Sequence, residues 1–202
     1  ASAAFGAAYG PRVLPGTYTV KMTKDKQVYT TDLKIIPDPR STHTAEDRRA
    51  QFDLSMKLHR QLGEMTFATE RINGIRLALD ERAARLAAGD PLRARLLSAS
   101  AQVDELRKKI VATKEGGAIT GEERLREFLT GLYGDVTFYE GRPSQTQSER
   151  ADALARELAD VVKDFDAWTA RELSGLNSEL TAKKLEALKP LTRDEWDKGG
   201  GQ

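Results

Sequence analysis

The fold is decided by residues 44–89, which read TAEDRRAQFDLSMKLHRQLGEMTFATERINGIRLALDERAARLAAG. Apolar residues recur in this stretch at spacings of three and four, which places them on one face of a helix. The stripe consists of Leu58, Leu62, Met65, Thr69, Ile72, Ile75, Leu79, Ala83 and Leu86. At 1.5 Å per residue such a helix is roughly 65 Å long, so it needs partners along most of its length.

Both ends of this helix carry recognisable signals. Thr44 stands three residues before Asp47, and a threonine hydroxyl at this position accepts hydrogen bonds from free backbone N–H groups while a carboxylate faces the positive helix end. At the other end Gly89 suits a left-handed helix terminus, Asp90 the cap of a next helix and Pro91 its first position. The sequence therefore predicts one helix that ends at Gly89 and a second that begins at Pro91.

Three helical stretches follow the first. Residues 91–114 carry a stripe with coiled-coil spacing, and residues 125–133 form a shorter helix that ends near Gly134, after a glycine-containing break at 115–121. A loop over 135–145 leads to a last long helix, which opens at Thr146 with Glu149 completing a capping box and runs towards Pro190. The tail after Leu191 is expected to fray.

The helix lengths predict an elongated three-helix antiparallel bundle. The two shorter helices within residues 91–133 together match the length of each long helix, so they count as one leg of the bundle. Up, down and up is the simplest order for three legs of similar length. The first helix then has its Gly89 end at one tip, and the loop over 135–145 lies at the other tip, beside the hairpin described next. The predicted core consists of Leu62, Ile72, Leu79, Leu96, Val103, Leu106, Leu158, Val161, Phe165 and Trp168.

Two alternating stretches precede the helices. In residues 17–22 the residues Tyr18, Val20 and Met22 share one face of a strand, and residues 27–36 alternate in the same way around Leu33 and Ile35. The polar turn at 24–26 makes the pair an antiparallel hairpin. A hairpin alone leaves its apolar face and both edges unpaired, so we expect its partner strands to lie outside this chain.

The hairpin sequence resembles a known family. The stretches LPGTYTVKM (14–22) and QVYTTDLKIIPDPR (27–40), followed by Gln51-Phe52 and Leu132-Tyr133-Gly134, are similar to the C-terminal region of large bacterial proteins with a sortilin-like, BNR-repeat β-propeller, often labelled glycosyl-hydrolase-like. The family usually has a glycine in the turn, where this chain has Lys24-Asp25-Lys26. The resemblance implies an exported (periplasmic or extracellular), accessory and non-catalytic region whose hairpin completes an immunoglobulin-like domain. The family's Asp-box repeats are absent from this chain, so no propeller activity is carried over.

Composition excludes several classes of partner. Lys+Arg 32 against Asp+Glu 31 gives a net charge of +1, so no overall field attracts nucleic acid or an anionic membrane. Cys 0 excludes disulfides and thiolate metal sites. The sequence has no apolar run of about eighteen residues, which argues against membrane insertion. Residues 1–10 are a flexible lead without the basic and apolar regions of a signal peptide, so an export signal would lie outside this chain.

Four groups of residues have the composition of a site, but none of them is predicted to form one. His43 and His59 stand apart without an HExxH carboxylate, and residues 116–121 have the spacing of a phosphate loop but Glu122 in place of its lysine. Three carboxylates on one side of a helix could bind a cation, but a solvated face explains them better: Glu157, Asp160 and Asp164. Four aromatic residues could stack on a sugar, but burial between the bundle and the hairpin explains them better: Phe128, Tyr133, Phe138 and Tyr139. We therefore predict no catalytic, cofactor-binding or metal residues.

The sequence thus predicts two regions with an interaction role. Residues 1–40 are the lead and the end of an immunoglobulin-like sandwich, and residues 41–202 are a long helical bundle with a short extra helix. The first hypothesis is a non-catalytic spacer or docking module whose partners are the preceding strands and propeller of the same protein, or another protein. A homo-oligomerising coiled-coil module is the alternative. Part of a glycoside-hydrolase-like enzyme is third, since it requires two carboxylates across a cleft that a slender bundle does not offer.

Overall fold

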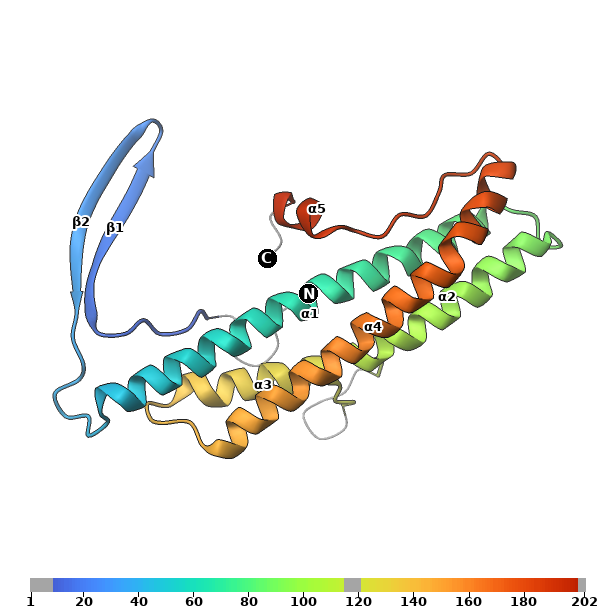
Figure 1. Cartoon of the computed structure of the whole chain (residues 1–202). Coiled ribbons are helices and arrows are strands. Elements are labelled where there is room, and N and C mark those ends of the chain that lie inside the picture. Colours follow the sequence, from blue (N-terminus) through green and yellow to red (C-terminus); the bar gives the residue numbers. More distant parts are fainter. Residues whose placement is uncertain (1–8, 115–120, 200–202) are drawn as a thin grey trace.

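The chain is mainly helical, with an antiparallel hairpin before the helices, as the sequence predicts (Figure 1). A computed structural model describes residues 9–114 and 121–199. Its elements are β1 (Gly16–Lys24), β2 (Gln27–Ile35), α1 (Ala45–Ala84), α2 (Pro91–Ile110), α3 (Leu125–Phe138), α4 (Gln145–Ala182) and α5 (Arg193–Lys198). Most of the flexible lead, the glycine-containing break with its phosphate-loop spacing and the last residues of the tail lie outside the described residues.

Helices α1 to α4 form an elongated body, which we call the helical rod (Figure 1). α1 runs from the hairpin end to the far tip, α2 and α3 return along it one after the other, and α4 runs to the tip again. The described residues contain five helices, so a three-helix bundle is not confirmed. The second leg predicted for residues 91–133 consists of the separate helices α2 and α3, and α5 is an additional short helix. α2 ends at Val111, whose backbone is extended (φ −117°, ψ 127°).

The apolar stripes of the rod helices meet in one core. Leu62 and Leu106 are only partly buried, whereas the other eight residues of the predicted core are buried. These eight are Ile72, Leu79, Leu96, Val103, Leu158, Val161, Phe165 and Trp168. The indole Nε1–H of Trp168 donates to Gln102 Oε1 at 3.0 Å, which satisfies its polar atom and ties α4 to α2.

Two helix starts agree with the capping signals and one does not. The Thr44 hydroxyl accepts from the Asp47 N–H and the Asp47 carboxylate accepts from the Thr44 N–H, while Asp90 caps α2 at Pro91. The cap of α4 is Ser144, two residues before the predicted Thr146, so the helix begins at Gln145. Two pairs in this stretch have the spacing of a capping box, Ser144 with Gln147 and Thr146 with Glu149. The first pair forms the box, in which the Ser144 hydroxyl accepts from the Gln147 N–H at 3.2 Å.

The helix ends show where the glycine signals mislead. α1 ends at Ala84 rather than Gly89, which does not adopt the left-handed conformation, and tight turns fill the residues between. α3 continues through Gly134 to Phe138, so the predicted loop begins four residues too early. Val136 is fully buried and extends the apolar stripe of α3. Its burial outweighs the cost of about 1 kcal/mol that a glycine imposes inside a helix.

The C-terminal part folds back instead of extending α4 to Pro190. α4 ends at Ala182, Lys184 takes a left-handed φ of 61°, and the chain returns along the rod to α5. Asn177 holds the returning segment, because its side-chain amide accepts from the Leu188 N–H at 2.7 Å and donates to the Leu188 carbonyl at 3.0 Å. The expected fraying after Leu191 is wrong for residues 192–198, where Thr192 caps the short helix α5.

Candidate functional site

The hairpin carries all but one of its large apolar residues on one face. The register sets Tyr18 opposite Leu33, Val20 opposite Thr31, and Met22 opposite Tyr29, and directly opposed residues of an antiparallel pair share a face. The other face consists of polar residues apart from Val28 near the turn: Thr17, Thr19, Lys21, Thr23, Thr30, Asp32 and Lys34. We call the first the apolar hairpin face. It alternates with a polar face in the way of a sheet that is covered on one side only.

No described residue covers most of the apolar hairpin face. The exposed fractions are 56% for Met22, 50% for Leu33, 48% for Tyr29 and 44% for Val20, and only residues at the base of the hairpin are half-buried. The hairpin projects away from the helical rod at the end where α1 begins (Figure 1). Apolar side chains gathered on one exposed surface and backed by a polar one are typical of interaction surfaces.

The turn at the tip of the hairpin is a two-residue loop of Asp25 and Lys26. Asp25 has a φ of 55°, a left-handed conformation that favours glycine and that aspartate tolerates better than most side chains. The chain thus makes a tight two-residue turn without a glycine.

A stiff connector joins the hairpin to the helices. Pro37 and Pro39 fix two backbone φ angles, and the guanidinium of Arg40 binds the Asp38 carboxylate between them at 2.7 Å. The Arg40 side chain and then its N–H hold the pKa of Asp38 below its ordinary value. On the other strand the Tyr18 hydroxyl donates to the Leu14 carbonyl at 2.6 Å. Both chain segments at the hairpin base are therefore held by local hydrogen bonds.

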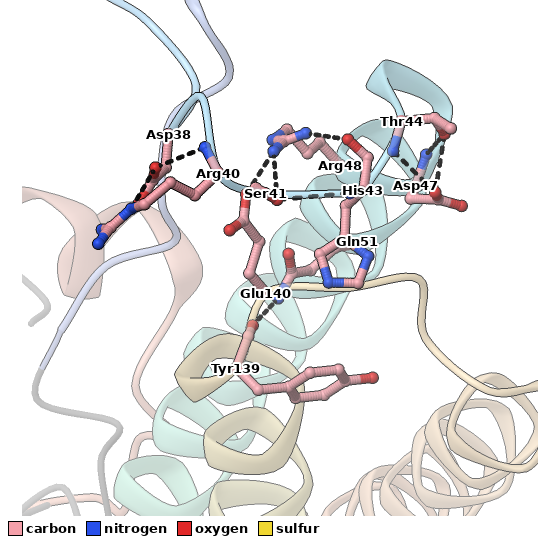
Figure 2. A network of polar contacts seen from close by, with 10 residues as sticks. All are labelled: Asp38, Arg40, Ser41, His43, Thr44, Asp47, Arg48, Gln51, Tyr139 and Glu140. Atoms are coloured by element: carbon pink, nitrogen blue, oxygen red, sulfur yellow. Dashed lines mark hydrogen bonds and ion pairs between the residues drawn. The ribbon is translucent and has the colours of Figure 1, made fainter.

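Arg48 fastens this connector to the helical rod. Its guanidinium donates to the His43 carbonyl at 2.5 Å and to the Ser41 hydroxyl at 2.8 Å, and it pairs with the Glu140 carboxylate at 2.7 Å (Figure 2). The side chain of Arg48 is only 12% exposed. One planar group thus joins the connector, the first turn of α1 and the residues after α3, a role that suits the fork geometry of arginine.

Gln51 closes the same joint one turn further along α1. Its side-chain amide donates to the carbonyl of Tyr139 (Figure 2) and to that of Val136 at 2.7 Å. Both carbonyls are free because the helix ends there. Arg142, in the loop between α3 and α4, adds an ion pair with Glu46 of α1 at 2.9 Å. A cavity of about 180 Å³ lies at this joint, lined among others by Leu14, Ile36, Arg48 and Phe52.

The predicted aromatic cluster is divided by the structure. Tyr133 is fully buried, and its hydroxyl donates to the Tyr9 carbonyl at 2.6 Å. Phe128, Phe138 and Tyr139 are exposed, so the prediction that all four fill a junction with the hairpin is wrong for these three. The prediction fails for Phe138 because the last turn of α3 carries this side chain outward. Phe128 instead lies beneath the guanidinium of Arg150, whose central carbon is 5.1 Å from the centre of the ring.

The other weighed residues do not form a reactive cluster. His59 is exposed and His43 is half-buried beside Gly141, while Glu157 and Asp164 make surface ion pairs with Arg150 and Lys109. Within residues 9–114 and 121–199, no group of three or more His, Asp or Glu residues is placed to hold a metal ion. None of the helices in that part of the chain is long and apolar enough to cross a membrane.

Sequence reasoning missed the joint residues Arg48, Gln51 and Glu140. They lie in charged stretches that resemble any solvated helix face, and their contacts join residues far apart in the chain. The apolar hairpin face, by contrast, is visible in the alternation of the sequence. No family model matches the chain, and no curated protein and no solved structure is found to be similar to it.

Proposed function

We propose that this chain is a non-catalytic interaction module, in which the helical rod holds the hairpin out as a docking sheet. The observation that carries the proposal is the apolar hairpin face, whose Met22 and Leu33 are half exposed or more while the opposite face is polar. A sheet of this kind gains its stability by packing on a second sheet.

The proposed partner is the rest of an immunoglobulin-like sandwich. The apolar hairpin face would form part of its inner layer, and the outer edges of β1 and β2 would pair with neighbouring strands. The resemblance over residues 14–40 supports strands and a β-propeller of the same exported protein as the source. On this proposal residues 1–40 belong to the sandwich and residues 41–202 are a spacer.

The joint supports a spacer that transmits orientation. Arg48 binds the His43 carbonyl, the Ser41 hydroxyl and the Glu140 carboxylate, and Gln51 binds the Val136 carbonyl. Together they position the connector relative to α1 and α3. A docking element that is merely tethered would not need such a clamp, because a flexible linker is sufficient to keep two domains close.

The test is amide hydrogen exchange in the full gene product that contains these residues, compared with the 202-residue chain alone. We expect the amides of residues 16–35 to exchange at least about a hundredfold more slowly in the full product, since a covered hairpin opens less often. Val20→Lys and Leu33→Lys should abolish this extra protection, whereas Thr19→Lys and Thr30→Lys, on the polar face, should leave it intact. Equal exchange of the hairpin in both contexts would refute the proposal.

A further inference from the structure

A second apolar surface lies on the helical rod itself, between α1 and α4. It is a half-open groove of about 680 Å³, lined on α1 by residues between 61 and 71 and on α4 by residues between 155 and 167. Ala68 and Leu158 are buried in its floor, and Phe67, Ala159 and Val162 form its walls. Small side chains on the α4 wall let another backbone approach closely.

The dimensions of the groove fit a helix. The lined stretches correspond to roughly 15 Å along α1 and roughly 18 Å along α4, which is about three helical turns. α1 and α4 touch each other less than either touches α2, so the rod is open along this seam. Gln61 Oε1 and Arg71 Nε, near the two ends of the α1 wall, are buried without a hydrogen-bond partner among the described residues. The seam is thus less complete than the rest of the core.

The charges along the groove leave one group unpaired. Glu64 pairs with Arg193, and Arg71 pairs with Asp166 at 3.0 Å. Lys163 is exposed on the α4 wall, and no ion pair of Lys163 is found in the described part of the chain. A ligand that carries a carboxylate opposite Lys163 would complement the groove.

The short helix α5 shows what this surface accepts. Trp196 packs on Phe67 with ring centroids 5.5 Å apart and donates its Nε1–H to Glu70 at 2.8 Å, while the Arg193 guanidinium lies 4.0 Å from the centre of the Phe67 ring. Phe67 is also a wall of the groove, so the groove continues into the surface that α5 already occupies. A helical segment with an apolar anchor is therefore seated at its rim.

We propose that the α1–α4 groove binds an amphipathic α-helix of a partner protein, with apolar residues at i, i+3, i+4 and i+7 and a carboxylate facing Lys163. This site is separate from the hairpin and does not depend on the proposed sandwich. A second copy of the chain does not fit, because the apolar stripes of α1 to α4 are already buried in its own core and α5 is too short to fill three turns. Helix-in-groove docking of this kind is a recurring mode of recognition.

The experiment uses the full chain and a fluorescein-labelled helical peptide of about fifteen residues, which spans roughly 22 Å as a helix. The peptide carries leucines at the stated spacing and one glutamate on the rim of its apolar face. Fluorescence anisotropy should show saturable binding. Ala159→Glu and Val162→Glu should each weaken it by at least about tenfold, because they place a charge in the apolar wall. Leu97→Glu, on an exposed part of α2 outside the groove, is the matched control and should bind as the unchanged chain does.

A charge exchange tests the predicted orientation. Lys163→Glu should weaken the binding of the glutamate peptide by roughly 2- to 5-fold, the range of an exposed ion pair, and a peptide with lysine in place of glutamate should regain it. Thermal unfolding of each variant checks that the rod is intact, and the exposed Ala159 serves if Val162→Glu unfolds. Absence of saturable binding up to about 1 mM, which corresponds to only about 4 kcal/mol, would overturn the proposal. So would equal binding by Ala159→Glu, or sedimentation showing that a second copy fills the groove.

Discussion

The hairpin and the helical rod follow the same design rule but differ in how far it is completed. Every element in both regions has one apolar face. In the rod these faces meet, so that Leu79, Leu96 and Val103 are fully buried, whereas in the hairpin Leu33 and Met22 remain exposed. The difference teaches that the same pattern can indicate a core or a contact surface, and that only the arrangement of elements decides which.

The contrast between buried and exposed apolar side chains is tested most strongly by the same substitution at a buried and at an exposed position of the rod. Phe165→Ala should destabilise the chain by about 3–5 kcal/mol, because Phe165 is 1% exposed in the core of the rod. Phe138→Ala, at a residue that is 61% exposed, should change the stability by less than about 0.5 kcal/mol. Urea unfolding followed by circular dichroism measures both. A small effect at Phe165 would contradict the core as described.

The joint between the two regions should respond less strongly. Arg48→Ala removes two hydrogen bonds and an ion pair from a side chain that is mostly buried, and we expect a loss of roughly 1–3 kcal/mol. The neighbouring Arg49 is exposed, so Arg49→Ala is the matched control and should have little effect. Small-angle X-ray scattering should also show a wider range of hairpin orientations for the first variant only. Identical scattering of both variants would show that Arg48 does not hold the hairpin.

A pH dependence separates α5 from the rest of the rod. Lys189, followed by the Thr192 N–H, lowers the pKa of Glu195 from 4.5 to about 2. The group therefore stabilises the docked α5 above pH 4.5, and this stabilisation is lost as the pH falls towards 2. In a Trp168→Phe background the fluorescence of Trp196 should change over this range before the helical signal does. Glu195→Gln should remove the early change, and its persistence would mean that another carboxylate is responsible.

The smallest expected effect concerns the hairpin turn. Asp25→Gly places a glycine where φ is 55° and should stabilise the hairpin by about 0.5–1 kcal/mol, seen as slower amide exchange in residues 16–35. Lys26→Gly is the control, because positive φ among the described non-glycine residues occurs at Asp25 and Lys184 and not at Lys26. Faster exchange in Asp25→Gly would show that the aspartate side chain itself holds the turn.

Local signals were sufficient to predict most of the fold. The Thr44 and Asp90 caps and the helical stripes are interactions between residues close in sequence, so their chemistry can be recognised without the structure. Gly134 and Ser144 show the limit of such signals. Gly134 does not end its helix, because the burial of Val136 outweighs the cost of a glycine inside a helix. At the start of α4 two possible capping boxes lie within a few residues of each other, and Ser144 forms the one that is observed.

The contacts that join distant segments could not be predicted in the same way. Gln51 bonds the carbonyl of Tyr139, and Trp196 packs on Phe67, yet nothing in the stretches around these residues distinguishes them from other surface side chains. The groove between α1 and α4 likewise depends on how closely two helices approach, which their stripes do not specify. The exposed hairpin face was expected, because a two-stranded sheet cannot cover itself.

The clamp at Arg48 has a mechanical consequence. α1 extends about 55 Å from Arg48 to its end at Ala84, so the helical rod is a lever arm whose pivot lies at the connector. By simple geometry, a tilt of about 5° at the pivot moves the far tip of α1 by about 5 Å, roughly the rise of one helical turn. A domain bound to the hairpin would therefore be held at a defined distance from a partner bound further along the rod. Strengthening or weakening the contacts of the Arg48 guanidinium would change how much this distance varies.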